Sequence, residues 1–178
     1  MRPGDSIFET ARNISDCQYV TGCPFNCHTD PSRPDASNKA IADFMSGLMS
    51  RFGLKALAQW EQAHLLQEKG HGGLVTEAPI GGKGAHIKTH EFCKWVAETV
   101  GESQKILVVG HPDHVKRVAT LLEYFGLKPM VSIESLFVYY DDRKLPGYQW
   151  WTRSPWVYIP WEYASRAVLF LKSLFGEL

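Results

Sequence analysis

Residues 105–125 constrain the fold of this chain more than any other segment, because a buried strand and an amphipathic helix follow each other there with almost no gap. Ile106 to Val109 is an unbroken apolar run rich in β-branched residues, which is typical of a strand buried on both faces of a parallel sheet. Apolar residues then recur at helical spacing, with Asp113 as the expected N-cap and Gly126 as the expected end. The segment predicts an α/β fold, a three-layer sandwich with a mainly parallel sheet.

A short polar loop separates this strand from this helix. It reads Gly110-His111-Pro112-Asp113-His114, and it follows the carboxyl end of the strand and precedes the amino end of the helix. Open α/β sheets bind their ligands at this edge. We therefore expect the functional site here.

Hydrophobic periodicity and turn residues predict the remaining elements as one domain over residues 1–178, with no internal repeat and no second core. The expected elements are a strand from Ile14 to Gly22, a helix capped by Ser37 or Asn38 and ended by Gly53, a helix from Leu54 to Lys69, a strand at Leu74 to Thr76, a helix from Thr89 to Val100, strands at Met130 to Ile133 and Leu136 to Tyr139, and a last helix from near Pro160.

Charge and hydropathy exclude some classes of partner. The chain of 178 residues has 19 basic and 19 acidic side chains, so it lacks the positive surface that binds nucleic acid. No apolar run approaches the roughly 20 residues of a transmembrane helix, and no apolar signal core follows Met1. We expect a cytoplasmic protein.

The cysteines allow two interpretations. Cys17, Cys23 and Cys27 with His28 form a loose cluster whose gaps match no standard zinc spacing. Small buried thiols in a reducing compartment are the alternative. We expect no metal there, and the sequence identifies no cofactor.

The first turn of the central helix carries an unusual excess of cations. His114, Lys116 and Arg117 lie where the helix dipole already presents partial positive charge. An anion bound there would reverse the unfavourable sign, held by the helix amides, by Arg117 and by a histidine. The pattern predicts an anion site.

Two other interpretations remain open. In the first, Arg117 pairs with Glu77, Glu91 or another carboxylate and has a structural role. In the second, His111 and His114 are metal ligands, although the spacing fixes no third ligand.

The run from Ile106 to Arg117, followed by a helix and Gly126-Leu127, resembles the "LLVTSxxHxxRA…GL" segment of the SanA/YdcF/ElyC-like family. His114 and Arg117 match the His-x-x-Arg of that segment. Further likenesses are looser: Glu77, Thr89 and Glu91 resemble a Glu…Thr-x-Glu-Asn element, and Glu162 resembles the acidic residue that opens the final helix. Phe92 stands where the family has Asn, and Gly22-Cys23-Pro24 replaces its Gly-Gly.

The resemblance implies a Rossmann-like three-layer α/β/α sandwich with a ligand at the carboxyl edge of the sheet. For some relatives it implies a role connected with the cell envelope, and it supplies no agreed reaction.

The expected ligand is a small phosphate- or nucleotide-like molecule. The candidate site residues are Gly110, His111, Asp113, His114 and Arg117, joined by Glu77, Thr89 and Glu91. In a catalytic version, His114 is the general acid or base, Arg117 stabilises negative charge and Glu91 orients the histidine.

The contrasting hypothesis is a non-enzymatic interaction protein. Residues 141–154 mix aromatic and charged side chains, and such surfaces are enriched in recognition patches. A lid over the site and a homodimer contact are comparable interpretations of this segment. The patch from Tyr148 to Trp156 would then bind a partner or a second copy of the chain.

Overall fold

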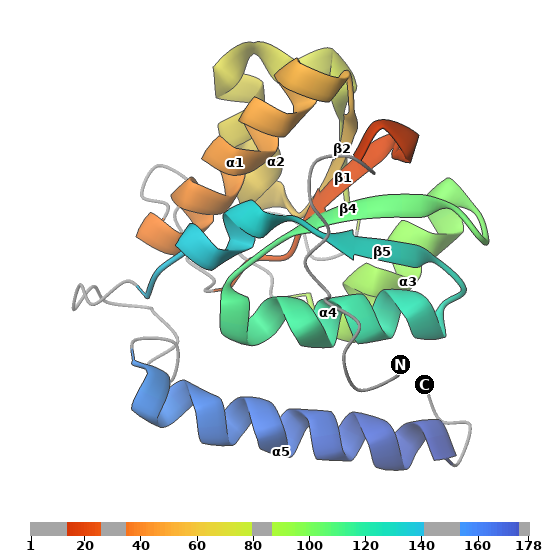
Figure 1. Cartoon of the computed structure of the whole chain (residues 1–178). Coiled ribbons are helices and arrows are strands. Elements are labelled where there is room, and N and C mark those ends of the chain that lie inside the picture. The colour runs from red at the N-terminus through yellow and green to blue at the C-terminus, as the bar shows by residue number, and fades with distance from the viewer. Residues whose placement is uncertain (1–13, 26–34, 80–86, 141–153, 175–178) are drawn as a thin grey trace.

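The computed structural model describes residues 14–25, 35–79, 87–140 and 154–174, and the strands in these ranges form one parallel sheet (Figure 1). They are β1 (Tyr19–Gly22), β2 (Lys55–Ala58), β3 (Val75–Glu77), β4 (Lys105–Val109) and β5 (Lys128–Val131). Their spatial order is β3-β2-β1-β4-β5, and each neighbouring pair is parallel. This is the strand order of Rossmann-like folds, so the predicted fold class is confirmed.

Helices cover both faces of the sheet. They are α1 (Ala36–Phe52), α2 (Trp60–Leu66), α3 (Thr89–Val100), α4 (Pro112–Tyr124) and α5 (Pro155–Leu174). Short helical turns lie at η1 (Ile14–Asp16), η2 (Gln67–His71), η3 (Gly72–Leu74) and η4 (Ile133–Phe137). Figure 1 shows α1 and α2 on one side of the sheet and α3 and α4 on the other, with α5 packed outside α4. The first four helices complete a three-layer sandwich, to which α5 is added.

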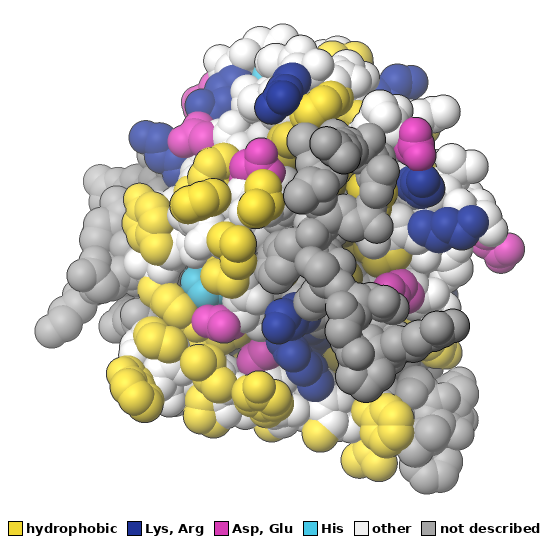
Figure 2. All heavy atoms as spheres, viewed as in Figure 1, with side chains coloured by type: hydrophobic (Ala, Val, Ile, Leu, Met, Phe, Trp, Pro, Cys, Tyr) yellow, Lys and Arg dark blue, Asp and Glu magenta, His cyan; other side chains and the backbone are white. Residues whose placement is uncertain are grey.

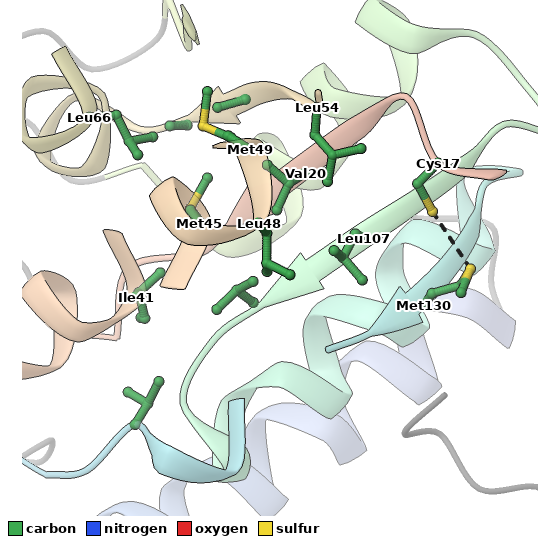
Figure 3. Packing of buried hydrophobic residues seen from close by; sticks show 14 of the residues in the cluster. Cys17, Val20, Ile41, Met45, Leu48, Met49, Leu54, Leu66, Leu107 and Met130 are labelled. Atoms are coloured by element: carbon green, nitrogen blue, oxygen red, sulfur yellow. Dashed lines mark hydrogen bonds between the residues drawn. The ribbon is translucent and has the colours of Figure 1, made fainter. Parts of the chain in front are cut away.

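Alternate residues of the strands supply the two cores. Val20, Ala56 and Leu107 face α1 and α2, where they pack among Met45, Met49 and other apolar side chains (Figure 3). Leu57, Ile106 and Val108 face α3 and α4 and pack with residues such as Phe92 and Val118. The apolar run of β4 is therefore buried on both sides, as predicted.

Close packing between β1 and α1 explains the glycine that ends β1. A Cβ built on Gly22 would overlap the Met45 sulfur and would lie 2.8 Å from Cγ2 of Ile41. Only a residue without a side chain lets α1 approach the strand this closely. Gly22 therefore ends β1 at the carboxyl edge of the sheet, in close contact with α1.

The largest error of the sequence prediction concerns residues 54–69. We expected one helix, whereas Lys55–Ala58 is strand β2 and the helix starts at Trp60. The sequence Lys-Ala-Leu-Ala has high helix propensity, but it pairs on one side with β1 and on the other with β3. Tertiary pairing overrides local propensity here.

Other element boundaries also differ from the prediction, among them β5, which is Lys128–Val131 and not Met130 to Ile133. β1 begins at Tyr19, because Ile14–Asp16 forms a 3-10 turn, and η4 replaces the strand expected at Leu136 to Tyr139. Asp35 caps α1 by accepting a hydrogen bond from the amide of Asn38 at 2.6 Å. The last helix starts at Pro155, which leaves Pro160 inside it.

Other expected elements are confirmed. α3 spans Thr89–Val100 as predicted, and α1 ends at Gly53, which adopts the left-handed conformation with φ 68°. Within the described ranges, no helix combines the length and the hydropathy needed to span a membrane. Residues 141–153, including most of the aromatic patch expected at Tyr148 to Trp156, lie outside the described residues.

Candidate functional site

The two central strands end side by side. Gly22 of β1 is paired with Val109 of β4, and the chain leaves the sheet there through Cys23 on one strand and Gly110-His111 on the other. From β1 the chain continues through α1 to β2, which pairs with one edge of β1, whereas β4 pairs with the opposite edge of β1. This is the topological switch point, where open α/β sheets bind ligands.

His111 is the first residue of the site, and it is the N-cap of α4 in place of the predicted Asp113. Its Nδ1 accepts a hydrogen bond from the Asp113 amide at 3.3 Å, and its ring stacks on Phe25 with centroids 3.8 Å apart. Burial, and then the neighbouring His114, lower the pKa of His111 from 6.5 to about 3. The ring is therefore neutral and part of the packing, while its buried Nε2 has no hydrogen-bond partner among the described residues.

The backbone amides at the start of α4 are already engaged. The amides of His114 and Val115 both donate to the carbonyl of His111, at 2.9 and 2.8 Å, and Pro112 has no amide hydrogen. With the Asp113 amide on the His111 ring, the first turn offers no free N–H donor in this structure. An anion near this helix would have to be held by side chains.

His114 lies in the middle of the cluster, on the first turn of α4. Its Nε2 is 3.4 Å from the Cys23 sulfur, and its Nδ1 is 3.0 Å from both the Tyr158 hydroxyl and a guanidinium nitrogen of Arg117. Burial lowers the pKa of His114 below 6.5, although Glu162 acts in the opposite direction. The imidazole is therefore neutral near pH 7.

Glu162 of α5 contacts Tyr158, Arg117 and Arg166 at once. Its carboxylate accepts hydrogen bonds from Tyr158 at 2.8 Å and from Arg166 at 3.0 Å, and it lies 3.3 Å from Arg117. Burial alone would raise the pKa of this carboxyl, but contacts with His114, Arg117 and Tyr158 outweigh it and lower the pKa from 4.5 to about 2. With only 3% of its side chain exposed, Glu162 is a buried anion with two guanidinium partners.

The neighbours of His114 support both tautomers of the neutral ring. Arg117 can only donate, so its bond to Nδ1 places the ring proton on Nε2, next to the Cys23 sulfur. Alternatively, Nδ1–H donates to the Tyr158 oxygen, whose own proton bonds Glu162, and Nε2 accepts from the thiol. Each tautomer satisfies one of the two neighbours of Nδ1, Arg117 or Tyr158, and leaves the other without a matching donor or acceptor.

Cys23 is the residue of this cluster that sequence analysis assigned elsewhere. It is 2% exposed, and burial raises the pKa of its thiol to about 12, with opposing contributions from Arg117 and Glu162. Glu61 also raises the pKa of this thiol, and the Thr89 side chain lowers it. In this structure Cys23 is a neutral thiol and not an activated nucleophile.

A pocket of about 120 Å³ opens beside the cluster, between the first turn of α4 and α5. It is lined by Pro112, Asp113, Lys116, Ile159, Glu162, Tyr163 and Arg166. Tyr140 donates to the Asp113 carboxylate at 2.6 Å, and Arg166 donates to the Asp113 carbonyl at 3.0 Å. Lys116, in contrast, is exposed and has no ion-pair partner in the part of the chain that the structure describes.

The structure brings some of the predicted site residues together and leaves others apart. Gly110, His111, His114 and Arg117 lie at the switch point, and the Gly110 amide donates to Ser135 Oγ at 3.2 Å. Thr89 reaches the same place through Cys23. The other two candidates are engaged differently, as described next.

Glu77 and Glu91 do not contact the histidine in this structure. Glu77 is exposed at the end of the edge strand β3, and Glu91 lies 3.9 Å from the Lys88 ammonium at the start of α3. The carboxylate nearest His114 is Glu162, at 3.6 Å. The sequence pointed to Glu162 only as the opening residue of a helix with Arg166 at the i, i+4 position, and that ion pair is present.

Sequence reasoning missed Phe25, Tyr140 and Tyr158 as parts of the site. Each contacts a histidine of α4 from a distant part of the chain, so no local pattern indicates it. A weak signal existed for Cys23, because it directly follows the first central strand.

The histidines and cysteines do not assemble with carboxylates into a metal-binding group in the described ranges. Cys17 is buried and lies 3.6 Å from the Met130 sulfur (Figure 3). Cys23 instead contacts His114. Cys27 and His28 lie outside the described residues.

Comparison of the chain with protein-family models, with curated proteins and with solved structures gave no match. The site must therefore be interpreted from its own geometry.

Proposed function

We propose that the protein binds a small phosphate- or nucleotide-like molecule at the carboxyl edge of its sheet. Its anionic group occupies the pocket between the first turn of α4 and α5. The observation that carries this proposal is the excess of positive charge around the pocket.

The charges near the pocket do not cancel. Glu162 is matched by two guanidinium groups, Arg117 at 3.3 Å and Arg166 at 3.0 Å, and Lys116 adds a third cation. Asp113 is the second carboxylate of the lining. Within the lining itself, Lys116 and Arg166 balance Asp113 and Glu162, so the excess of one positive charge comes from Arg117, which contacts Glu162 from outside the lining. A bound anion neutralises this excess. Arginine and lysine side chains at such a site typically donate hydrogen bonds to phosphate oxygens.

The size of the pocket limits what it encloses. Pockets that bury a whole drug-sized ligand measure roughly 300–1,000 Å³, whereas this one is about 120 Å³. We infer that it holds a phosphate-sized group, with Ile159 and Tyr163 as the apolar part of the lining.

If the protein is catalytic, His114 is the proposed general acid or base, and Arg117 stabilises negative charge. Glu162, 3.6 Å from His114, takes the orienting part that we first gave to Glu91. Of the other candidates, Asp113 lines the pocket, Gly110 and His111 lie at the start of the helix without lining it, and Thr89 acts on the neighbouring thiol of Cys23. A contribution of Glu77 would require a ligand that reaches the edge of the sheet.

Calorimetric titration of the full chain with inorganic phosphate and with a nucleoside monophosphate tests the proposal. Lys116→Gln should weaken binding about 10- to 100-fold, which corresponds to the ~1.5–3 kcal/mol of a charge-assisted hydrogen bond. Lys94→Gln, which removes an exposed lysine of α3, is the matched control and should leave affinity unchanged. Absence of heat with both ligands at millimolar concentration, or equal loss in both variants, would refute it.

The second candidate function, a non-enzymatic interaction protein, is favoured by one described residue of the aromatic patch. Trp156 is 88% exposed at the start of α5. A tryptophan this exposed is typical of a surface that binds a partner, and a homodimer is the partner that we argue for below.

Two further expectations stay proposals. Membership of the SanA/YdcF/ElyC-like family depends on the resemblance of residues 106–117. A cytoplasmic location is supported by the free thiols of Cys23 and Cys93, which are typical of a reducing compartment.

A further inference from the structure

Helix α5 is amphipathic, but its polar side faces the protein and its apolar side faces outward, the reverse of an ordinary surface helix. Its inward side carries Tyr158, Glu162 and Arg166, whose polar contacts are made with α4 and with one another. Its outward side is apolar, and Figure 2 shows hydrophobic side chains along the edge of the molecule that α5 forms. The exposed large apolar residues are Trp156, Val157, Ile159, Trp161, Tyr163, Val168, Phe170 and Leu171.

This outer face of α5 is larger than the apolar patches of ordinary monomers. Taking ~150–250 Å² for an aromatic side chain and ~60–120 Å² for an aliphatic one, the exposed fractions of these residues correspond to roughly 700 Å². The largest patch on a typical monomer measures about 300–600 Å². Each partner of a standard protein interface contributes about 800 Å². The outer face of α5 is thus close to the size of one half of an interface.

The shape of the outer face favours another helix as the occupant. At 3.6 residues per turn, Pro160, Ala164 and Ala167 lie opposite the buried side, and all three are exposed. Larger residues flank this line, among them Trp156 and Tyr163 at seven-residue spacing. Small residues between two ridges let a second helix axis approach to about 8–10 Å.

We propose that this face is the interface of a symmetric homodimer, in which α5 packs antiparallel against α5 of a second copy. A two-fold interface requires a self-complementary surface. The antiparallel arrangement places the large residues at each end of one helix against the opposite end of the other, around the small residues at the centre. The outer face carries no carboxylate, so two copies meet there without like-charge repulsion from acidic groups.

A membrane surface fits these observations less well. Helices that lie in a bilayer interface carry Lys and Arg on their polar side and insert their largest apolar residues most deeply. In α5 the polar side faces the protein, where Arg166 is held by Glu162, and three of the residues opposite it, Pro160, Ala164 and Ala167, are small. The net charge of the chain is zero, so it offers no general attraction to anionic lipid.

The test is the mass of the full chain in solution, measured by light scattering after size-exclusion chromatography. We expect twice the chain mass of 20.1 kDa for the wild type and a single chain mass for Ala164→Glu, which places a charge at the centre of the face. Ser50→Glu, on the exposed side of α1, is the matched control and should stay dimeric. Circular dichroism melts check that both variants fold.

A second variant locates the contact. Ala164→Cys should form a disulfide between two copies on mild oxidation, because the residue lies near the two-fold axis, whereas Ser50→Cys should not. A monomeric wild type at tens of micromolar, or a dimer that Ala164→Glu leaves intact, would overturn the proposal. So would sedimentation with phosphatidylcholine–phosphatidylglycerol vesicles that Ala164→Glu abolishes, since that result assigns the face to a membrane.

Discussion

Replacing Glu162 by glutamine is the most informative single change to this protein. The substitution keeps the size of the side chain but removes the charge that Arg117, Arg166 and the Tyr158 hydroxyl share. Arg117, only 16% exposed, is then left in a buried setting without its anion.

Two independent routes give the expected loss of stability at pH 7. The pKa of Glu162 falls from 4.5 to about 2 on folding, and at 1.36 kcal/mol per pKa unit this corresponds to about 3 kcal/mol. Removing one partner of a buried ion pair costs about 3–5 kcal/mol in other proteins. The remaining Arg166–Asp113 contact moderates the loss, so we expect about 3 kcal/mol.

The pH dependence has a definite sign. Because the folded pKa lies below the unfolded one, protons bind the unfolded chain first as the pH falls. The stabilisation by Glu162 is therefore complete above pH 4.5 and disappears as the pH falls towards 2. Glu162→Gln should lack this part of the acid denaturation profile, and the two proteins should converge near pH 2.

Urea denaturation between pH 7 and pH 2 measures both quantities. Glu123→Gln, which neutralises an exposed carboxylate on α4, is the control and should differ from the wild type by no more than about 0.5 kcal/mol at pH 7. A loss below 1 kcal/mol in Glu162→Gln, or an acid profile parallel to that of the wild type, would refute the assignment of Glu162 as the central anion.

Two further predictions concern β1 and the residue after it. Gly22→Ala should lower the free energy of unfolding by about 1–3 kcal/mol, because the new Cβ meets Met45 and Ile41. Gly47→Ala, in the open middle of α1, should raise it by about 0.5–1 kcal/mol. Urea denaturation curves that rank the two variants the other way contradict the packing argument. Cys23 should resist iodoacetamide at pH 8 in the folded protein and react after unfolding, because burial raises the pKa of its thiol to about 12; rapid labelling of its peptide in the native state would disprove this.

The elements that local patterns predicted correctly are those whose sequence and environment agree. β4 is apolar on both faces and is buried on both faces, and α3 has caps and periodicity that match its packing. β2 could not be predicted in this way, because Ala and Leu favour a helix and only the neighbouring strands make Lys55–Ala58 extended. The early start of α5 was missed because Pro160 is favoured in a first turn, while Pro155 takes that place.

The site was predictable only where its residues share one segment. His111, His114 and Arg117 follow β4 directly, so the position of the strand was enough to place them at the carboxyl edge. The partners of these residues come from β1 and α5, and neither spacing nor composition reveals that Cys23 lies 3.4 Å from His114 or that Glu162 neutralises Arg117. Long-range pairing of this kind is a property of the packed chain.

The position of the central carboxylate in the last helix also orders the events of synthesis. A chain leaving the ribosome exposes all five strands and α4 before Glu162, so the sheet can assemble while Arg117 and His114 are still hydrated. Burial of these two side chains has to wait until α5 supplies its charge. The closed state of the site is therefore a signal that α5 has been made, and a nascent chain that ends before α5 carries an open one.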